Sequence, residues 1–250
     1  MGADTGVEIV RATCRLAIIP SSLAEDPDAH KARECGGKES CGACKLIDAL
    51  YNTQRIVARA KNLVTRDYWA ADGAALDDFR LENARDPKSK EWPMHEHNAY
   101  GDIRRAFPKL ASGIAAQVAR EMRTKWRQDR FDALIRCAKS PPHYRDTGPI
   151  PVRKQDIAFA CTGKNAYAVK LSLRSGRHEG GREFSIEIRA RDAHQRKLLS
   201  ELADKDGTVR HADVKIDRDR KNRWNLRMGY TRRVPLRVTG GAAALNRGIR

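Results

Sequence analysis

The chain has 250 residues, of which 49 are Lys or Arg and 32 are Asp or Glu, and its formal net charge is +17. A field of this sign favours polyanions, either nucleic acid or an anionic membrane surface. The sequence lacks an apolar run of the roughly 18–20 residues that span a bilayer, a signal peptide, and the cysteine density of a disulfide scaffold. We therefore expect a soluble cytoplasmic protein with no membrane partner.

The first predicted element is a strand over residues 7–20, "VEIVRATCRLAIIP", which alternates in character and is rich in β-branched residues. A polar loop and a Cys/Gly-rich stretch follow. From Leu46 to about Trp69, apolar residues recur every three or four positions without Pro or Gly, which predicts a long amphipathic helix. A weak helix is indicated at 74–85. A second strong helix runs from Ser112, as its N-cap, to about Ile135.

The segment "KSPPHYRDTGPIP" interrupts this pattern with four prolines and a glycine, and it indicates a boundary. Beyond it the period becomes two, with turn-forming residues between the apolar runs. One short helix is predicted at 191–203. The predicted strands are Ile157–Cys161, Tyr167–Arg174, Phe184–Arg189, Val209–Ile216 and Trp224–Tyr230. Five short strands in about 80 residues, with an inserted helix, favour a small antiparallel barrel.

The first strand has no partner nearby, and a strand cannot leave its backbone groups unpaired. We expect it to join the later sheet, so that the helical part is an excursion from the barrel. The predicted fold class is α+β: a small antiparallel oligonucleotide-binding-like β-barrel split by a helical insertion. Residues 139–250 hold 26 basic and 12 acidic residues, a net charge of +14, so we expect the polyanion surface mainly in this half.

The segments "SPPHYRDTGPIPVRKQDIAF", "YAVKLSL", "HADVKIDRDRKNRWNLRMGY" and "AALNRGIR" give the chain a family likeness. It resembles the N-terminal part of type V CRISPR effectors and their TnpB relatives, over essentially its whole length. In that family a wedge barrel is split by a helical recognition module. The resemblance implies a first wedge strand at 1–20, a helical module at 21–138, a wedge barrel at 139–238, and a linker with the start of a RuvC-like segment at 239–250.

In this family the RuvC-like nuclease begins with a strand ending in Asp-x-Gly, and Asn246 stands where that Asp is expected. A neutral amide keeps the shape of a carboxylate but loses the charge that holds hard cations. We expect no nuclease activity from this chain and a need for magnesium only with a downstream RuvC-like domain or partner chain. The terminal "LNRGIR" could also match the motif by chance.

The resemblance implies a function: binding of guide RNA and recognition of double-stranded target DNA, in a prokaryotic setting such as antiviral defence. Two alternatives remain open. The chain could be a stand-alone RNA- or DNA-binding protein with a basic barrel and a helical arm. It could also be part of an RNA-guided DNA endonuclease that a downstream domain completes. No constellation of catalytic residues is recognisable in the sequence.

Basic residues in the second half are the first candidates for phosphate contacts, which would make affinity depend steeply on salt. A solvated charged face is the alternative for any one charge run. The candidates are Arg145, Arg153, Lys154, Arg174, Arg177, Arg218, Arg220, Lys221, Arg223, Arg232, Arg233 and Arg237. Tyr144, which precedes Arg145 in a predicted loop, is a candidate for base stacking.

In the helical part, the resemblance places a DNA-motif reader near the long helix, where Asn62 can bond adenine in the manner of Asn side chains generally. An exposed polar helix residue is the alternative. Neighbouring candidates for nucleic-acid contacts are Arg55, Arg59, Lys61 and Arg66, and further along Arg104, Arg105 and Lys109.

Cys41 and Cys44 have the CxxC spacing of a zinc knuckle, with Cys35 and His30 upstream. Three thiolates and an imidazole can complete a tetrahedral structural zinc site. The chain holds no second CxxC pair, so reduced cysteines near a helix start remain the alternative. No other cofactor is indicated.

Overall fold

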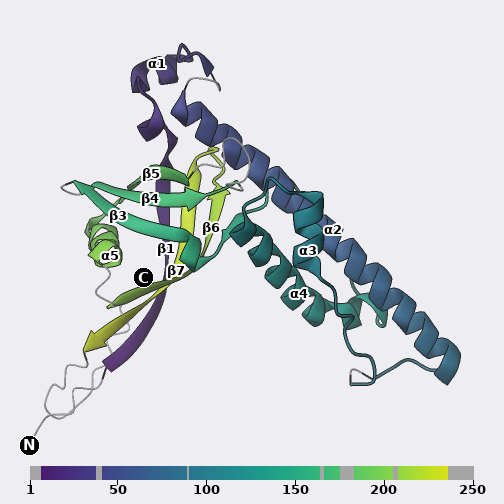
Figure 1. Cartoon of the computed structure of the whole chain (residues 1–250). Coiled ribbons are helices and arrows are strands. Elements are labelled where there is room, and N and C mark those ends of the chain that lie inside the picture. The colour runs from purple at the N-terminus through teal and green to yellow at the C-terminus, as the bar shows by residue number, and fades with distance from the viewer. Residues whose placement is uncertain are drawn as a thin grey trace, which may run out of the picture.

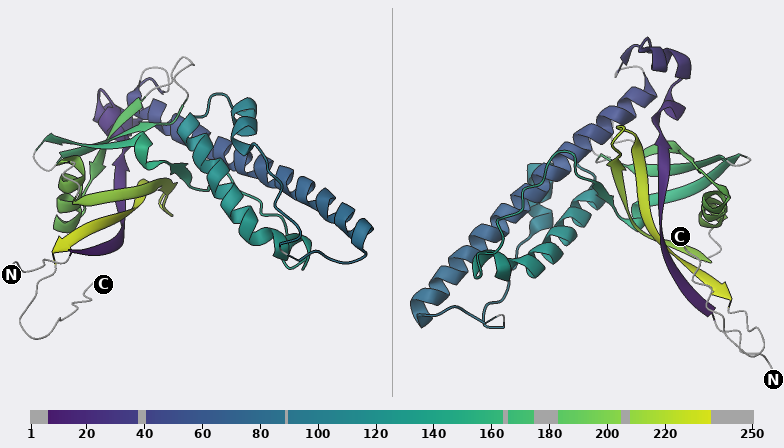
Figure 2. Two further views of the ribbon diagram at one scale, coloured as in Figure 1. Left: turned by 60° about the horizontal axis from the view of Figure 1, so that its bottom comes forward. Right: turned by 180° about the vertical axis from the view of Figure 1, so that it is seen from behind.

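The computed structural model describes residues 7–37, 41–88, 90–163, 166–174, 183–204 and 208–235. A curled β-sheet with one helix forms one half of the molecule, and a pair of long helices projects from it (Figure 1). Views from below and from behind agree on this arrangement (Figure 2). The candidates Arg177, Arg237 and Asn246 lie outside the described residues.

The sheet has seven strands in the order β2-β6-β7-β1-β5-β4-β3, and every neighbouring pair is antiparallel. The strands are β1 (Val7–Ile19), β2 (Ile150–Val152), β3 (Ile157–Gly163), β4 (Ala166–Ser172), β5 (Glu183–Arg189), β6 (Val209–Arg218) and β7 (Trp224–Pro235). The five predicted strands after residue 150 are confirmed. The three-residue β2 was missed because it is too short to show a period.

The N-terminal strand β1 lies at the centre of this sheet. It pairs with β7 from Val7↔Pro235 to Ala17↔Asn225, and with β5 from Ala17↔Arg189 to Ile19↔Glu187. The expected return of this strand to the later sheet is confirmed. Segments more than 200 residues apart in the sequence therefore share one hydrogen-bond ladder, with the helical pair between them in the chain.

The predicted closed barrel is a curled, open sheet over the described residues, with β2 and β3 at its two ends. Helix α5 (Ala193–Asp204) contacts β3 and β6 and buries Leu198, Leu199 and Leu202. The apolar side of this amphipathic helix therefore packs against the inner face of the sheet. The mixed α+β class agrees with the prediction, whereas the oligonucleotide-binding-like identity stays a prediction.

The remaining helical elements precede β2 or follow it directly. They are η1 (Pro20–Leu23), α1 (Pro27–Ala32), α2 (Gly42–Asn83), α3 (Ala99–Ala106), α4 (Ser112–Leu134) and η3 (Lys154–Asp156). Helix α2 is longer than predicted because the weak helix predicted at 74–85 continues it without a break. Gly73 lies within the helix at a position where an added Cβ would meet no atom within 4 Å. Ala111 occupies the N-cap position of α4, one residue before the predicted Ser112.

Helices α2 and α4 pack through apolar faces that include Val57 and Val64 of α2 and Val118 and Met122 of α4. The same core continues into the inner face of the sheet, where Leu16 and Leu226 are fully buried. Over the described residues, no helix combines the length and apolar character needed to cross a membrane.

A buried polar cluster holds the far end of the helical pair together. Asp72, which is 0% exposed, accepts hydrogen bonds from the indole Nε1 of Trp126 at 2.7 Å and from the backbone N–H of His95 at 2.8 Å. Arg130 lies 3.5 Å from the same carboxylate, and its guanidinium stacks over the Trp92 ring at 4.4 Å. One carboxylate therefore fixes α4 and the segment before α3 onto α2.

Candidate nucleic-acid interface and metal centre

Basic side chains gather on the outer face of three adjacent strands, β6, β7 and β1. Because successive side chains of a strand point to opposite faces, the apolar residues of β1 and β7 line the core while the alternate positions face outward. We call the outward cations the cationic face. Its members are Arg11, Arg15, Arg210, Lys215, Arg227 and Arg233, all of them exposed.

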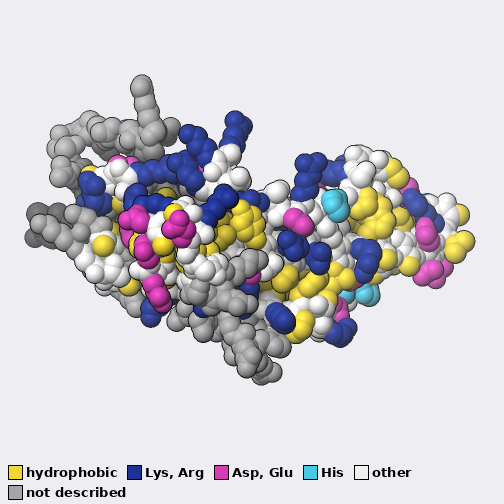
Figure 3. Space-filling model, turned by 90° about the horizontal axis from the view of Figure 1, so that it is seen from above, with side chains coloured by type: hydrophobic (Ala, Val, Ile, Leu, Met, Phe, Trp, Pro, Cys, Tyr) yellow, Lys and Arg dark blue, Asp and Glu magenta, His cyan; other side chains and the backbone are white. Residues whose placement is uncertain are grey.

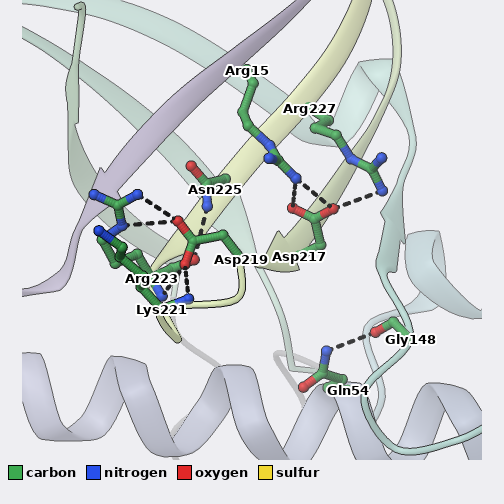
Figure 4. Close-up of polar contacts among 9 residues, drawn as sticks. All are labelled: Arg15, Gln54, Gly148, Asp217, Asp219, Lys221, Arg223, Asn225 and Arg227. Atoms are coloured by element: carbon green, nitrogen blue, oxygen red, sulfur yellow. Dashed lines mark hydrogen bonds and ion pairs between the residues drawn. The ribbon is translucent and has the colours of Figure 1, made fainter.

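Three of these cations stand in one cross-strand row. Arg15 is paired with Arg227, and Arg227 is paired with Lys215. Like charges directly opposite each other on a sheet are destabilising. The neighbouring Asp217 lies 3.5 Å from Arg15 and 2.7 Å from Arg227, and this one carboxylate lies between the two guanidinium groups (Figure 4). Lys215 lies 3.7 Å from Glu121 of α4.

A second row, Arg210, Thr231 and Arg11, contains no acid. It borders an open groove of about 610 Å³ that Lys154, Arg120 and Asp213 also line, and Arg120 is ion-paired with Asp213. Small residues, including Gly229, form part of its lining, where an added Cβ would meet only Ala212 at 3.8 Å and a backbone oxygen at 4.0 Å. A polyanion backbone can therefore approach the strands closely at this point.

The β6–β7 hairpin presents further cations at its tip. Asp219 accepts hydrogen bonds from the backbone N–H groups of Lys221 and Arg223, each at 2.9 Å, and from the Arg223 guanidinium at 2.8 Å (Figure 4). The pKa of Asp219 is lowered to about 2, and the largest cause is the hydrogen bond from the backbone N–H of Arg223. Asn222 takes a left-handed conformation with φ 58°. The acid thus shapes a tip from which Arg220 and Lys221 extend into solvent.

Arg218, also a predicted phosphate contact, is held by aromatic rings. Its guanidinium lies 4.6 Å from the centroid of Tyr51 on α2 and 5.5 Å from that of Trp224. It also donates a hydrogen bond to the Tyr51 hydroxyl at 3.2 Å. This side chain joins the hairpin to the long helix.

The predicted contacts on α2 separate into two groups. Arg55, Arg59 and Arg66 are exposed along the helix. Lys61 is buried, with its Nζ 3.1 Å from Glu121 of α4 and 5.6 Å from the centroid of the Tyr144 ring. Lys61 is therefore already paired within the protein.

Asn62 and Tyr144 were predicted as a base reader and a stacking residue, and the structure brings them together. The Asn62 amide donates to the Tyr144 carbonyl at 3.0 Å and accepts from its backbone N–H at 2.8 Å. Tyr144 lies in a loop, as predicted, but its ring packs against the core, and burial raises its pKa to about 12. The contact holds the segment before β2 against α2.

Other predicted cations form contacts within the chain. Arg104 donates to the Leu110 carbonyl, and the pairs Arg105–Asp102, Arg153–Asp156, Arg174–Asp48, Arg223–Asp219 and Arg232–Glu201 are ion pairs. The Arg153–Asp156 pair packs directly on Gly113 at the start of α4, where a Cβ would meet the Asp156 carboxylate at 1.8 Å. Lys109, Arg145, Lys154 and Arg233 are exposed.

Most of the cationic face was missed by the sequence analysis. The sequence analysis selected cations from charge runs at predicted turns, such as "RDRKNRW". The cationic face instead consists of isolated cations at alternate strand positions. The signal was present as Arg11-x-Thr13-x-Arg15 and as the alternate positions 223, 227 and 233. Only the pairing of β1 with β7 places these short series side by side.

Four side chains between β1 and α2 form a compact cluster suited to a metal. The ligand atoms of His30, Cys35, Cys41 and Cys44 all lie within 4.8 Å of one another. His30 Nδ1 is 3.6, 3.5 and 3.6 Å from the sulfurs of Cys35, Cys41 and Cys44, and Cys35 Sγ lies 3.6 Å from Cys44 Sγ. Zn–S and Zn–N bonds of about 2.3 and 2.0 Å place tetrahedral ligands about 3.5–3.8 Å apart. The donor set and its spacing fit a structural zinc ion.

Local backbone geometry builds this cluster. His30 lies on α1, and Arg33 ends that helix in a left-handed conformation with φ 64°. Gly36 and Gly37, with φ of 67° and 76°, turn the chain back toward α2. Cys41 is the N-cap of α2, and the pKa of its thiol is lowered, chiefly by a hydrogen bond from the backbone N–H of Cys44. A thiolate is thereby favoured at one of the four positions.

No protein-family model matches the chain, and no curated protein matches it. Among solved structures, it is similar to a chain in a cryo-EM structure of a Cas12f1–sgRNA–target DNA complex, with 12% sequence identity and a TM-score of 0.48. The match covers 91% of this chain and 59% of that chain. Values this low do not assign a family, and the chain spans less than two thirds of the protein it matches.

Proposed function

We propose that this chain binds guide RNA and recognises target DNA as the N-terminal lobe of a type V or TnpB-like RNA-guided effector. In this proposal residues 1–20 and 139–238 form the wedge, 21–138 form the recognition module, and 239–250 lead into a RuvC-like segment. The sequence resemblance supports this assignment, together with a central N-terminal strand separated in the chain from its sheet neighbours by a helical pair.

The observation that carries the proposal is the cross-strand row Arg15, Arg227 and Lys215 on the cationic face. Placing three like charges side by side costs folding stability, and Asp217 and Glu121 together neutralise only part of it. Phosphate groups supply the missing negative charge and release their own counterions on binding. The face is therefore suited to a nucleic-acid backbone.

In the proposed mechanism the protein binds the nucleic-acid backbone and the guide RNA selects the sequence. Cations on the sheet grip phosphates and fix the position of the nucleic acid, while base pairing supplies the sequence choice. Arg55, Arg59 and Arg66 extend the positive surface along α2 toward the far end of the helical pair. Asn62 takes a positioning role here, because its amide already bonds the Tyr144 backbone.

His30, Cys35, Cys41 and Cys44 would hold a zinc ion that cross-links α1 to the start of α2. Such a four-ligand site is structural, since no position stays open for a reacting group. Its role in the proposed function is to fix the start of α2 beside the end of β1.

Binding of the whole chain to a structured RNA and to duplex DNA over a salt series tests the proposal. Six phosphate contacts predict a slope of about −5 in a plot of log affinity against log salt. A flat response would remove the electrostatic basis of the proposal. Sequencing of RNA that copurifies with the chain then separates the two binding hypotheses, since a discrete guide-like species supports the effector lobe and bulk RNA supports a stand-alone binder.

A further inference from the structure

A cavity of about 760 Å³ opens where the end of β1, the first turns of α2 and the β6–β7 hairpin meet, away from the groove on the cationic face. In Figure 1 this junction lies below α1, at the upper end of the sheet. The volume lies in the range of small-molecule and cofactor sites. It is large enough for one nucleotide.

The lining of this cavity combines an apolar floor with a basic rim. Ile18, Ile19, Ile47 and two prolines supply apolar surface. The rim holds four cations, Lys31, Arg189, Arg191 and Arg223. Among the described residues no carboxylate lines the cavity. Arg189 and Arg191 are exposed. Figure 3, a view from above, shows Lys and Arg side chains spread along this face of the molecule.

One wall of the cavity is aromatic. Tyr51 is 38% exposed, and its ring packs edge-to-face with that of Trp224, with the ring centroids 5.4 Å apart. Arg218 fixes the ring, because its guanidinium stacks on it and bonds its hydroxyl. A ring held in this way loses little freedom when a planar ligand stacks on it. The adjacent Asn222 and Asn225 also line the cavity with amide groups.

We propose that this cavity binds one unpaired nucleotide of the nucleic acid held by the lobe, with its base against Tyr51 and its phosphate on Arg189 and Arg191. This inference rests on the proposed function and adds a subsite to it. Unstacked bases are commonly held on aromatic side chains and guanidinium planes. Lys31 and Arg223 already pair with Asp28 and Asp219, whereas Arg189 and Arg191 form no ion pair among the described residues, so an uncharged apolar ligand would leave these two cations without an anion. A fully paired duplex cannot present a separate base to Tyr51.

The test compares three RNA probes binding to the whole chain: a blunt hairpin, the same hairpin with a short unpaired adenosine tail, and the same hairpin with an abasic tail. The adenosine tail is expected to strengthen binding about tenfold beyond the abasic tail, which has the same phosphates but no bases. Equal affinities for the two tails overturn the inference. Absence of salt-dependent binding to the blunt hairpin instead overturns the proposed function, so the two failures are distinguishable.

Variants assign the effect to the cavity. Tyr51→Ala is expected to abolish the gain from the adenosine bases, while Tyr51→Phe keeps the ring and retains the gain. Tyr100→Ala, at an exposed tyrosine of α3, is the matched control and keeps the gain. The double variant R189Q/R191Q is expected to weaken binding of both tails alike and to leave the blunt hairpin unchanged. A base-dependent gain that survives in Tyr51→Ala contradicts the assignment.

Discussion

The helical pair and the cationic face use the same charged residue types in opposite ways. In and beside the helical pair, Lys61 meets Glu121 at 3.1 Å, and Lys139 meets Asp129 at 2.8 Å and Asp132 at 3.0 Å. On the sheet, Arg15 and Arg227 share Asp217. Residue type alone would treat the cations of these two regions alike. The geometry separates cations that complete the fold from cations that await an external anion.

The difference follows from how neighbours arise in each kind of structure. On a helix, residues three or four apart are neighbours, so one segment can place an acid beside a base. On a sheet, neighbours come from different strands, and Arg15 meets Arg227 only because β1 returns to β7. A like-charge row on a sheet therefore requires three separate segments to place a cation at matching positions.

The largest expected effect is removal of the metal from the junction between the two regions. The chain is expected to bind one zinc ion, and chelation or the change Cys41→Ser should remove it, because one missing thiolate opens the tetrahedral set. Hydrogen exchange should then show loss of protection in Pro27–Ala32 and the first turn of α2, with the pairing of β1 and β7 retained.

Cys161→Ser is the control for this change, since Cys161 is exposed on β3 and lies outside the cluster. It should keep the full zinc content by elemental analysis. A protein that contains no zinc when purified without chelator, or that keeps zinc after Cys41→Ser, would show that these are ordinary reduced cysteines.

The next effect concerns the buried charges of the helical pair. Asp72→Ala should lower the free energy of unfolding by about 3–5 kcal/mol, because it leaves the buried Arg130 without its partner. The N–H groups of Trp126 and His95 lose their acceptor as well. Urea denaturation measures this change.

Asp77→Ala provides the comparison on the same helix. The Asp77 side chain is 75% exposed and lies 3.9 Å from Arg80, so its removal should change the free energy of unfolding by less than about 0.5 kcal/mol. Equal effects of the two substitutions would contradict the structural role assigned to Asp72.

Strand and helix positions were largely predictable from the sequence because each depends on local periodicity. The long-range return of β1 was also predictable, since an isolated strand has no partner for its backbone groups. The open curl of the sheet was not, because the covering of its inner face by α5 depends on packing between distant segments.

The candidate site was less predictable than the fold. CxxC spacing together with Cys35 and His30 indicated the cluster that the structure assembles. In contrast, Arg153 and Arg232 have the composition of phosphate contacts but pair with Asp156 and Glu201. The sequence shows which residues are basic, but it does not show which of them lie beside an acid in the folded chain.

A third prediction separates paired from unpaired cations directly. The triple variant R11Q/R210Q/R233Q removes three exposed cations of the cationic face that hold no ion pair among the described residues. Affinity for duplex RNA at moderate salt should fall at least tenfold, and the slope of log affinity against log salt should fall by about 2.7 in magnitude. Fluorescence anisotropy over a salt series gives both values.

The matched control is R80Q/R85Q/R136Q, which lowers the net charge by the same three units at sites already paired with Asp86, Glu91 and Asp132. Its affinity and its salt slope should stay close to those of the unchanged chain. If the two triple variants weaken binding equally, total charge and not the cationic face governs the interaction.

The smallest expected effect is local and tests the one acid at the hairpin tip. The backbone N–H of Arg223 holds the pKa of Asp219 at about 2, below the value of about 3.9 for an unfolded chain. A lowered folded-state pKa means that the contribution of Asp219 to the hairpin is complete above about pH 4 and is lost as the pH falls toward 2. The amide signals of Lys221 and Arg223 in NMR spectra should therefore shift together in that window.

Asp219→Asn should remove this titration, because an amide has no proton to gain in that range. The tip cations Arg220 and Lys221 should keep their exposure in the unchanged chain at neutral pH, where the carboxylate orders the turn without pairing with either of them. Amide shifts that persist in Asp219→Asn, or a midpoint near pH 4 in the unchanged chain, would contradict the role of this carboxylate in ordering the turn.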